Sequence, residues 1–296
     1  MSRYILVLQA MRLPFLVLAP ICVFLAVAIA RSQQVAFDGV NVFLCLLGAL
    51  AAHIAVNTLN EYQDFKSGLD FKTVRTPFSG GSGLLPTNPE VANQVLLVCI
   101  IALLLTVTVG CYFVALHGWQ IVPLGLFGLL LVVTYTRWIN RNALLCLLAP
   151  GIGFGIFIVG GSYFCITGEY NNTMWQLSFI PFLLINNLLL VNQYPDIDAD
   201  KSVGRNHFPI KYGVKVSTAI YILFSVSAQL LLAYLVFLGG LPDRALFAFI
   251  PMLLSYGVMV GLLRLGKNIA VNPKFLAANV GCSVLTPLVL AISLYL

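Results

Sequence analysis

Residues 175–201 read WQLSFIPFLLINNLLLVNQYPDIDADK, and they join a membrane-length apolar run to a cluster of acids. The first 20 residues, Trp175–Tyr194, contain no Asp, Glu, Lys or Arg. About 20 such residues in a helix span the hydrocarbon core of a bilayer. Asp196, Asp198 and Asp200 follow directly. The stretch therefore predicts a transmembrane helix whose end carries polar chemistry.

Eight further segments have a similar length and apolar character, so we predict nine transmembrane helices. Charged residues make up only 9% of the 296 residues, whereas a soluble domain carries about 25%. Since so few charges cannot cover a water-facing surface, the predicted fold class is an all-α membrane protein. The nine spans are Leu13–Ala30, Val40–Asn57, Val91–Leu116, Trp119–Thr136, Ala143–Ile166, Trp175–Tyr194, Val216–Leu238, Leu246–Leu265 and Phe275–Leu296.

The first span has an alternative interpretation, because residues 28–30 (Ala-Ile-Ala) resemble the cleavage site of a secretory signal peptide. The apolar run is long for a signal, and Arg12 directly before it suits the end of a functional helix. We therefore expect the span to be retained. The seven cysteines lie in apolar stretches without a CxxC spacing, which predicts packing residues and no disulfide framework.

The basic residues predict the orientation of the chain, because Lys and Arg stay on the cytoplasmic side of membrane proteins. With the N-terminus in the cytoplasm and nine spans, 14 of the 16 basic residues fall inside. Only Arg31 and Arg244 fall outside. We therefore predict a multi-pass protein of a bacterial-type inner or cell membrane, with its C-terminus outside.

Six of the ten acidic residues fall in two short clusters, both on the predicted cytoplasmic side. The first cluster, residues 57–70, follows span two, and the second, residues 192–200, follows span six. Residues three or four apart share a helix face. The first cluster thus predicts a stripe of Asn57, Asn60 and Asp64, with a neighbouring stripe of His53, Asn57 and Glu61.

The second cluster predicts a stripe of Asn192, Asp196 and Asp200, provided that the helix continues past Pro195. Stacked carboxylates repel one another, and more strongly when they lose water, so a cation should compensate them. Mg²⁺ suits this role because it prefers oxygen ligands and often binds carboxylates together with substrate phosphates. The plainer alternative is that these acids only solvate helix ends among the lipid headgroups.

The arrangement also looks duplicated, since each acidic cluster follows an even-numbered span and precedes a basic, glycine-containing loop. The offset between the two is four helices. We therefore interpret residues 1–296 as a single transmembrane domain. It would consist of two related four-helix units that face each other across a central cavity, plus a ninth helix.

The loops that follow the clusters carry candidate phosphate-binding groups. Residues 80–83 (Gly-Gly-Ser-Gly) can present backbone N–H groups to phosphate, although a flexible connector would have the same composition. The loop lacks the GK[ST] ending of a nucleotide P-loop, which argues against an ATP site. Arg75, Arg205 and Lys211 suit diphosphate oxygens, but each could instead be a positive-inside anchor. The histidines His53, His117 and His207 form no zinc motif and are interpreted as structural.

On these residues the chain resembles the UbiA superfamily of intramembrane prenyltransferases, over almost its whole length. The motifs that carry the resemblance are Asn60-Glu61-xx-Asp64-xxx-Gly68-x-Asp70 and Asn192-xxx-Asp196-x-Asp198-x-Asp200-xxx-Gly204-Arg205, followed by Lys211-Tyr212-Gly213. They look most like the branch that prenylates 1,4-dihydroxy-2-naphthoate in menaquinone synthesis. The chain departs from the pattern at Glu61, Gly68 and His207.

The resemblance implies a fold of nine transmembrane helices around a central cavity, and Mg²⁺-dependent transfer from a polyprenyl diphosphate to an aromatic acceptor. It implies catalytic roles for Asp64, Asp196 and Asp200. The implied ligands of two Mg²⁺ ions are Asn60, Asp64, Asp70, Asn192, Asp196 and Asp200. The residues implied to contact phosphate or acceptor are Arg75, Tyr135, Arg137, Arg205 and Lys211.

Other functions remain open at this point. The runner-up acceptor is 4-hydroxybenzoate, followed by other aromatic compounds. An ion-coupled transporter is the rival from another class, because acids near membrane helices often mark ion paths. A transporter predicts charges near the middle of the spans, whereas these acids gather at one end beside basic loops. The sequence gives no sign of nucleic-acid binding.

Overall fold

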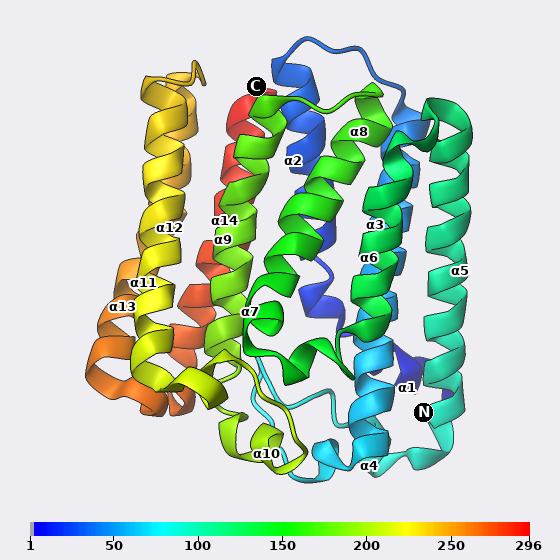
Figure 1. Cartoon of the computed structure of the whole chain (residues 1–296), viewed down its shortest axis with the longest axis vertical. Helices are drawn as coiled ribbons and strands as arrows, with labels where there is room; N and C mark the ends of the chain where they lie inside the picture. The colour runs from blue at the N-terminus through cyan, green and yellow to red at the C-terminus, as the bar shows by residue number, and fades with distance from the viewer. Residues whose placement is uncertain (1–2) are drawn as a thin grey trace.

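The computed structural model describes residues 3–296, and the side chains of residues 6–296, as a bundle of helices (Figure 1). No residue in the described range belongs to a β-strand. The side chain of Arg3, one of the predicted inside residues, lies outside the described part. Figure 1 places the first and last described residues at opposite ends of the bundle, as an odd number of crossings requires.

Eight helical segments within residues 3–296 are long and apolar enough to cross a membrane, and a ninth, Trp119–Thr134, is shorter. Each of the nine predicted spans corresponds to one of these segments, so the predicted fold class is confirmed. The short ninth makes the count of nine approximate. The eight long segments are Leu13–Ser32, Gly39–Ser67, Pro89–His117, Ala143–Thr167, Asn172–Asn192, Phe208–Phe237, Asp243–Val271 and Pro273–Tyr295.

The helices of the bundle follow one another in a simple order. They are α1 (Arg3–Ala10), α2 (Leu18–Ser32), α3 (Gly39–Ser67), α4 (Leu84–Thr87), α5 (Ala92–His117), α6 (Val122–Thr134), α7 (Ala143–Gly151), α8 (Gly161–Thr167), α9 (Asn172–Asn192), α10 (Ile197–Ser202), α11 (Phe208–Phe237), α12 (Phe249–Met252), α13 (Leu254–Leu265) and α14 (Pro273–Tyr295). The segment η6 (Ile152–Gly160) is a π-helix that joins α7 to α8.

Polar side chains hold α9 to its neighbours in the middle of the bundle. Asn187 Nδ2 donates hydrogen bonds to the Tyr221 carbonyl and to Ser225 Oγ of α11, each at 2.9 Å. Asn279 Nδ2 on α14 donates to the Asn187 carbonyl at 3.0 Å. Apolar side chains gain little from meeting each other in lipid, so hydrogen bonds and close packing fix such contacts.

The π-helix η6 packs directly against α9 because glycines remove the intervening side chains. The backbone N–H of Gly151 donates to Asn186 Oδ1 at 2.6 Å. A Cβ atom on Gly155 would lie 2.7 Å from Phe182 N and from Ser178 O. Pro150, which lacks an N–H donor, stands directly before this irregular segment. The other face of η6 carries the large side chains of Phe154 and Phe157.

Two details differ from the sequence-based expectations. The second acidic stripe depended on a helix that continues past Pro195, and this condition is not met: α9 ends at Asn192 and a turn through Pro195 leads into the separate helix α10. The residue before a proline disfavours the helical region, so the helix stops there. By contrast, α3 continues to Ser67, ten residues beyond the predicted end of its span. The first acidic cluster is therefore mostly helical, and the second is a turn and a short helix.

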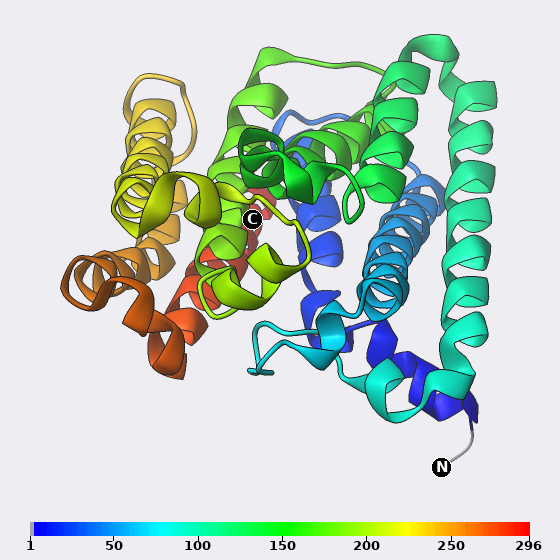
Figure 2. The ribbon, with the colours of Figure 1, turned by 60° about the horizontal axis from the view of Figure 1, so that its bottom comes forward.

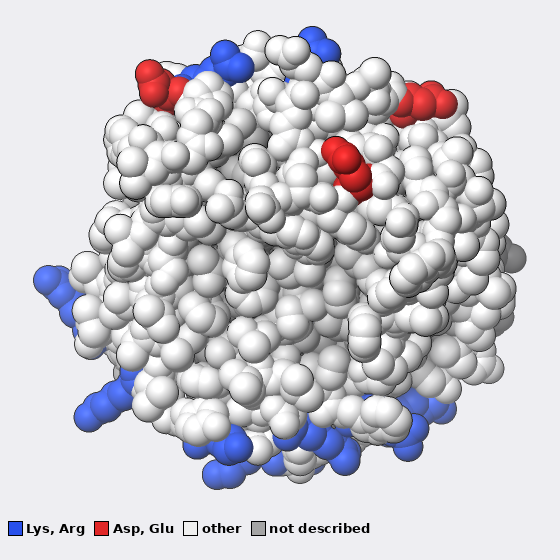
Figure 3. Space-filling view, turned by 45° about the horizontal axis from the view of Figure 1, so that its top comes forward, with Lys and Arg blue, Asp and Glu red and all other residues white. Residues whose placement is uncertain are grey.

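The charged residues lie at the two ends of the bundle. In Figure 3, Lys and Arg gather along the lower rim, a few charged residues lie at the upper end, and the surface between them is almost free of charge. The loop of residues 72–83 and α10 lie side by side at the lower end (Figures 1 and 2), where Lys72 Nζ donates to Ser202 Oγ at 3.3 Å. The two acidic clusters therefore share one end of the molecule.

Candidate active site

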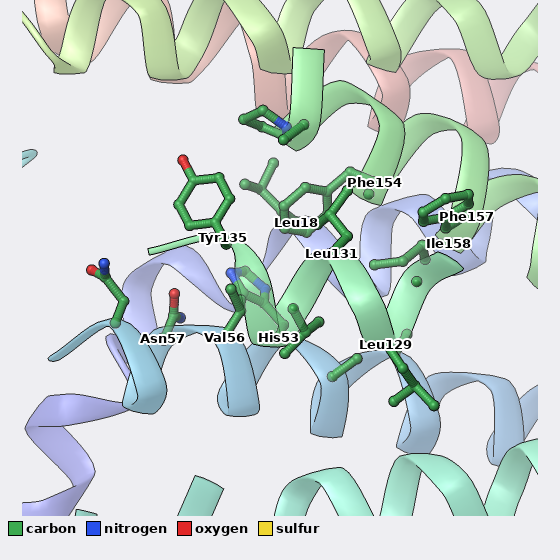
Figure 4. A pocket seen from close by; sticks show the side chains of 18 of the residues that line it. Leu18, His53, Val56, Asn57, Leu129, Leu131, Tyr135, Phe154, Phe157 and Ile158 are labelled. Atoms are coloured by element: carbon green, nitrogen blue, oxygen red, sulfur yellow. The ribbon is translucent and has the colours of Figure 1, made fainter. Parts of the chain in front are cut away.

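A cavity of about 600 Å³ runs into the bundle from the end that carries both acidic clusters. Its walls come from α3, α5, α6, η6 and α9, with α10 and the loop of residues 72–83 at its mouth. Figure 4 shows part of its wall: His53, Val56 and Asn57 of α3 face Leu131 and Tyr135 across the hollow, with Phe154 and Phe157 of η6 beside them. The cavity is polar at the mouth and apolar in its depth.

All six side chains predicted to bind Mg²⁺ line this cavity. They are Asn60, Asp64, Asp70, Asn192, Asp196 and Asp200. Three of them belong to the first cluster and three to the second, and more than 100 residues of sequence separate the clusters, so the bundle itself brings the two motifs together. The geometry meets the first requirement of the metal hypothesis, while the role of each residue remains a prediction.

The first cluster reaches the cavity through α3 and the turn that ends it. Asn57, Asn60 and Asp64 lie on one face of α3, as their spacing predicts. Gly68 ends the helix with a left-handed φ of 78°, a conformation that costs glycine little. The 3₁₀ turn after it buries Asp70 beside the stripe, with 5% of the residue exposed.

Arg205 links the two clusters. Its Nη1 donates to Asp200 Oδ1 at 2.9 Å, and its Nη2 forms an ion pair with Asp64. Nε2 of the buried His207 lies 3.1 Å from Asp200 Oδ2. One guanidinium thus holds carboxylates from both halves of the chain.

A second arginine, Arg12, approaches the first cluster from the start of the chain. Its Nη2 lies 3.5 Å from Glu61 Oε2 and 3.5 Å from Asn60 Oδ1. Arg12 has a positive φ of 54°, which is unusual for a residue with a side chain and often marks a functional position. Glu61 also accepts hydrogen bonds from the backbone N–H (3.1 Å) and hydroxyl of Ser82.

The glycine-rich loop closes over the first cluster. Gly80, Gly81 and Gly83 have φ values of 83°, 75° and 74°, so each needs the freedom of glycine. A Cβ atom on Gly81 would lie 3.0 Å from Asp70 Oδ1. The loop therefore packs its bare backbone against the acids, and Gly80 and Gly81 line the cavity.

The nearby arginines do not fully compensate the carboxylates of the site. Burial raises the pKa of Asp70 to about 7, and the charges of Glu61 and Asp64 add to the rise. Burial likewise raises the pKa of Asp196 to about 7, with a further contribution from Asp200. Such shifts mean that no nearby cation balances the charge of an ionised carboxylate at these positions.

Three oxygens of the predicted Mg²⁺ ligands have no hydrogen-bond partner although they are buried: Asp70 Oδ2, Asn192 Oδ1 and Asp196 Oδ1. Buried polar atoms normally have partners, and carboxylate and amide oxygens are ligands that Mg²⁺ accepts. Among the described residues, no three His, Cys, Asp or Glu side chains lie close enough to hold a metal by themselves. The donor set therefore fits Mg²⁺ that completes its shell with water and phosphate oxygens.

The five residues predicted to contact phosphate or acceptor divide into two groups. Tyr135 and Arg205 line the cavity. Arg75, Arg137 and Lys211 are exposed and lie outside its lining, so their contact with substrate stays a prediction. The guanidinium of Arg75 packs on the backbone at Gly83, and Lys211 Nζ lies 5.2 Å from the centre of the Tyr212 ring.

Several residues that line the cavity were not predicted from the sequence. His53 and His207 were interpreted as structural, yet both lie in the wall. For His53 the signal was its position in a stripe with Asn57 and Glu61. Asn140 and Gln193 also line the cavity, and nothing in their spacing distinguishes them from ordinary polar residues near a membrane surface.

The cavity wall is loosely packed between α5 and α6. Val107 and Cys111 of α5 and Leu126 of α6 line the cavity and are exposed. Between them, Gly110 and Gly125 have nothing within 4 Å of the place where a Cβ atom would stand. We interpret this loosely packed stretch of the wall as a side opening toward lipid.

Comparison with known proteins gives a consistent result. The model of the UbiA prenyltransferase family matches residues 17–280. The 1,4-dihydroxy-2-naphthoate octaprenyltransferase of Haemophilus influenzae is 25% identical over 76% of this chain and 75% of its own length. The protein of the same name from Bacillus subtilis is 28% identical over 67% of this chain, and the match spans 61%, less than two thirds, of that protein.

The fold also matches a solved structure, that of a UbiA homologue from Archaeoglobus fulgidus bound to GPP and Mg²⁺. The TM-score is 0.69, the sequence identity is 16%, and the alignment covers 98% of this chain and 99% of the other. At this identity the likeness establishes the shared helical architecture.

Proposed function

This chain belongs to the UbiA prenyltransferase family, and on that premise we propose that it transfers a polyprenyl group from a polyprenyl diphosphate to an aromatic acceptor with Mg²⁺. The acceptor we propose is 1,4-dihydroxy-2-naphthoate, the compound in the names of two curated relatives. This reaction would belong to menaquinone biosynthesis. The observation that carries the proposal is the convergence of six Asn and Asp side chains at the mouth of a cavity whose depth is apolar.

The polar end of the cavity suits a diphosphate bound with metal. Asn60, Asp64 and Asp70 on one side, and Asn192, Asp196 and Asp200 on the other, are the proposed Mg²⁺ ligands. Bound Mg²⁺ supplies positive charge that stabilises the leaving diphosphate. Arg12 and Arg205 are fixed beside the same carboxylates and add charge that is already oriented before the reaction.

The chemistry that this arrangement supports is an alkylation. The C–O bond of the allylic diphosphate breaks, and the diphosphate leaves with the electron pair. A ring carbon of the acceptor then forms a C–C bond with the allylic carbon. With the naphthoate, the carboxyl group leaves that ring carbon as CO₂, so no ring proton has to be removed.

The apolar part of the cavity suits the other end of the substrate. A cationic allylic group must be kept away from water, and the faces of Phe154 and Phe157 in the wall offer electron density instead. The side opening between α5 and α6 suits a prenyl chain that is already dissolved in the bilayer. A lipid-soluble product could leave by the same route.

The proposal is tested by product analysis with the full-length protein in detergent or lipid. Geranylgeranyl and longer diphosphates are each combined with 1,4-dihydroxy-2-naphthoate, 4-hydroxybenzoate, other aromatic acids and a non-aromatic alcohol, with and without Mg²⁺. We expect a prenylated naphthol with loss of CO₂, detected by mass. If only 4-hydroxybenzoate or only the alcohol is prenylated, that compound is the acceptor and the proposed one is wrong.

The same preparation separates the enzyme from the rival transporter. Protein in liposomes that moves ions but yields no prenylated product with any acceptor would overturn the proposal. The position of the acids already argues against an ion path, because they lie at one end of the bundle and not along its middle.

Two further proposals concern the orientation of the chain in the membrane and its domain organisation. We propose that the cavity mouth faces the cytoplasm of a bacterial-type inner or cell membrane. The support is the 14-to-2 division of basic residues. We also propose that the chain is one domain built from two related four-helix units and a ninth helix. Cysteines introduced in the loop of residues 72–83, if labelled only from the cytoplasmic side, would support the orientation.

A further inference from the structure

The cavity wall contains a buried histidine that the proposed metal and diphosphate chemistry does not use. His53 of α3 lines the cavity, and only 6% of the residue is exposed. Its Nδ1 atom is buried and has no hydrogen-bond partner among the described residues. A buried polar atom without a partner costs free energy, so the position calls for a ligand that supplies the partner.

His53 stands between the two chemical environments of the cavity. An α-helix rises about 1.5 Å per residue, which places His53 roughly 10 Å from Asn60 along α3, on the apolar side of the proposed metal ligands. A diphosphate held at the mouth must direct its first prenyl carbon inward, toward this level. The ring that attacks that carbon has to lie here too.

The surroundings of His53 suit a flat aromatic molecule. The Phe154 ring meets the His53 ring edge to face, with centroids 4.8 Å apart. Asn57, one turn nearer the mouth, is fixed because its Nδ2 donates to the Met11 carbonyl at 3.0 Å. Figure 4 shows His53 and Asn57 projecting from α3 into the hollow, with Tyr135 on the facing wall.

We propose that His53 binds a ring hydroxyl of the aromatic acceptor, and that Asn57, Tyr135 and Phe154 form the rest of the acceptor site. The inference rests on the proposed function and deepens it. An imidazole nitrogen accepts a hydrogen bond from the hydroxyl, and this bond raises the electron density on the aromatic ring of the acceptor. The bond also sets which ring carbon faces the allylic carbon. No covalent bond to His53 forms, and the histidine keeps its own protons.

Kinetics with two co-substrates test this directly, because the acceptor and the diphosphate have separate KM values. In His53→Phe, which keeps the ring packing and loses the hydrogen bond, the acceptor KM should rise at least about tenfold, the equivalent of one lost hydrogen bond to a buried group. The KM for the prenyl diphosphate should change less than about twofold. His53→Asn has a side-chain amide near the Nδ1 position, and His53→Gln has one near Nε2. One of these variants should keep the acceptor KM close to that of the wild type.

Thr58→Val is the matched control. Thr58 lies on the same helix, is fully buried and lies outside the cavity lining. Its hydroxyl already donates to the Ile54 carbonyl at 2.7 Å. Removing that hydroxyl should leave both KM values unchanged.

A measurement on the wild-type protein covers the case that His53→Phe does not fold. The two mono-methyl ethers of 1,4-dihydroxy-2-naphthoate each lack one hydroxyl donor. They are compared as inhibitors with a non-reacting analogue of the acceptor that keeps both hydroxyls. One of the ethers should inhibit the wild type at least about tenfold more weakly than this analogue. Where His53→Phe folds, it should bind the ether and the analogue about equally.

The outcomes separate this inference from the proposed function. Prenyl transfer with an unchanged acceptor KM in His53→Phe, or a parallel rise in both KM values, would overturn the role of His53 and leave the function intact. Equal inhibition of the wild type by all ethers and the unmethylated analogue would overturn it too. Absence of any transfer by the wild type would instead overturn the proposed function.

Discussion

Arg205 forms an ion pair with Asp64 although 141 residues of sequence separate them. The same guanidinium donates to Asp200 at 2.9 Å. Because the two acids belong to different clusters, this one side chain sets the distance across the cavity mouth.

Replacing an acid at the cavity mouth should abolish activity and leave the fold intact. In Asp64→Ala or Asp196→Ala, transfer should fall by about 10²-fold or more, the range for losing a group that stabilises charge in the transition state. Product mass gives the activity and gel filtration in detergent gives the fold. The control is Asp198→Ala in the same cluster, whose side chain is exposed and lies outside the cavity lining. Near-wild-type activity of Asp64→Ala with Mg²⁺ would count against the metal assignment.

Removal of Arg205 should destabilise the metal-free protein more than the metal-bound one. Arg205→Gln leaves Asp64 and Asp200 without their cation, and breaking one partner of a buried pair costs about 3–5 kcal/mol. Thermal unfolding in EDTA should show a lower Tm, and Mg²⁺ should recover more of the Tm in the variant than in the wild type. Arg264→Gln, at an exposed site outside the cavity lining, should change neither value. The hypothesis fails if Mg²⁺ shifts both proteins equally.

Chelation should stop turnover reversibly, because the proposed leaving group depends on Mg²⁺. EDTA in excess over the metal should reduce product formation to background, and added Mg²⁺ should restore it. The measurement is product formed before and after metal is returned to the same sample. Turnover that continues in EDTA would remove the metal from the mechanism.

The raised pKa values at the mouth predict how metal binding and stability depend on pH. Asp70 and Asp196 have pKa values of about 7 without metal, above about 4 for an unfolded Asp. The folded state then binds protons more tightly, so the stability of the metal-free protein should fall as pH rises from about 4 to 7. Mg²⁺ must displace these protons, so its apparent affinity should weaken below about pH 7. Tm values across this range, in EDTA and in Mg²⁺, test both trends.

Close packing of η6 on α9 makes a prediction about stability alone. Gly155→Ala would force its Cβ to within 2.7 Å of the α9 backbone, and overpacking of this kind costs about 1–3 kcal/mol. Gly153 in the same π-helix has only Leu131 Cδ2 nearby, at 3.8 Å, so Gly153→Ala should be tolerated. The two Tm values in detergent should therefore differ, with Gly155→Ala the lower.

The nine spans were predictable from the sequence because length and apolar character are local properties of a chain. Their ends were less so. Pro195 interrupts the helix that would have carried the second stripe. The position of Asp200 at the cavity therefore depends on the turn after α9, which neighbouring helices hold in place. The first stripe was right in its spacing because α3 continues as a regular helix through Asp64.

The site was predictable to the extent that it consists of periodic acids. Arg12 reaches Glu61 from the turn after α1, and His207 reaches Asp200 only through the fold of the loop between them. Such contacts depend on tertiary structure, which the spacing of residues along the sequence does not predict. Arg75 and Lys211 show the converse, since each is basic and follows a cluster in the sequence yet lies outside the cavity lining.

The opening between α5 and α6 has a consequence for the isoprenoid tail. A closed pocket would act as a ruler, because a longer tail would meet its end wall. With Gly110 and Gly125 at an open side, the remote isoprene units can remain among the acyl chains while only the first few enter the protein. Tail length in the product would then be decided by whichever synthase supplies the diphosphate, and a single enzyme of this kind could serve cells that make prenyl diphosphates of different lengths.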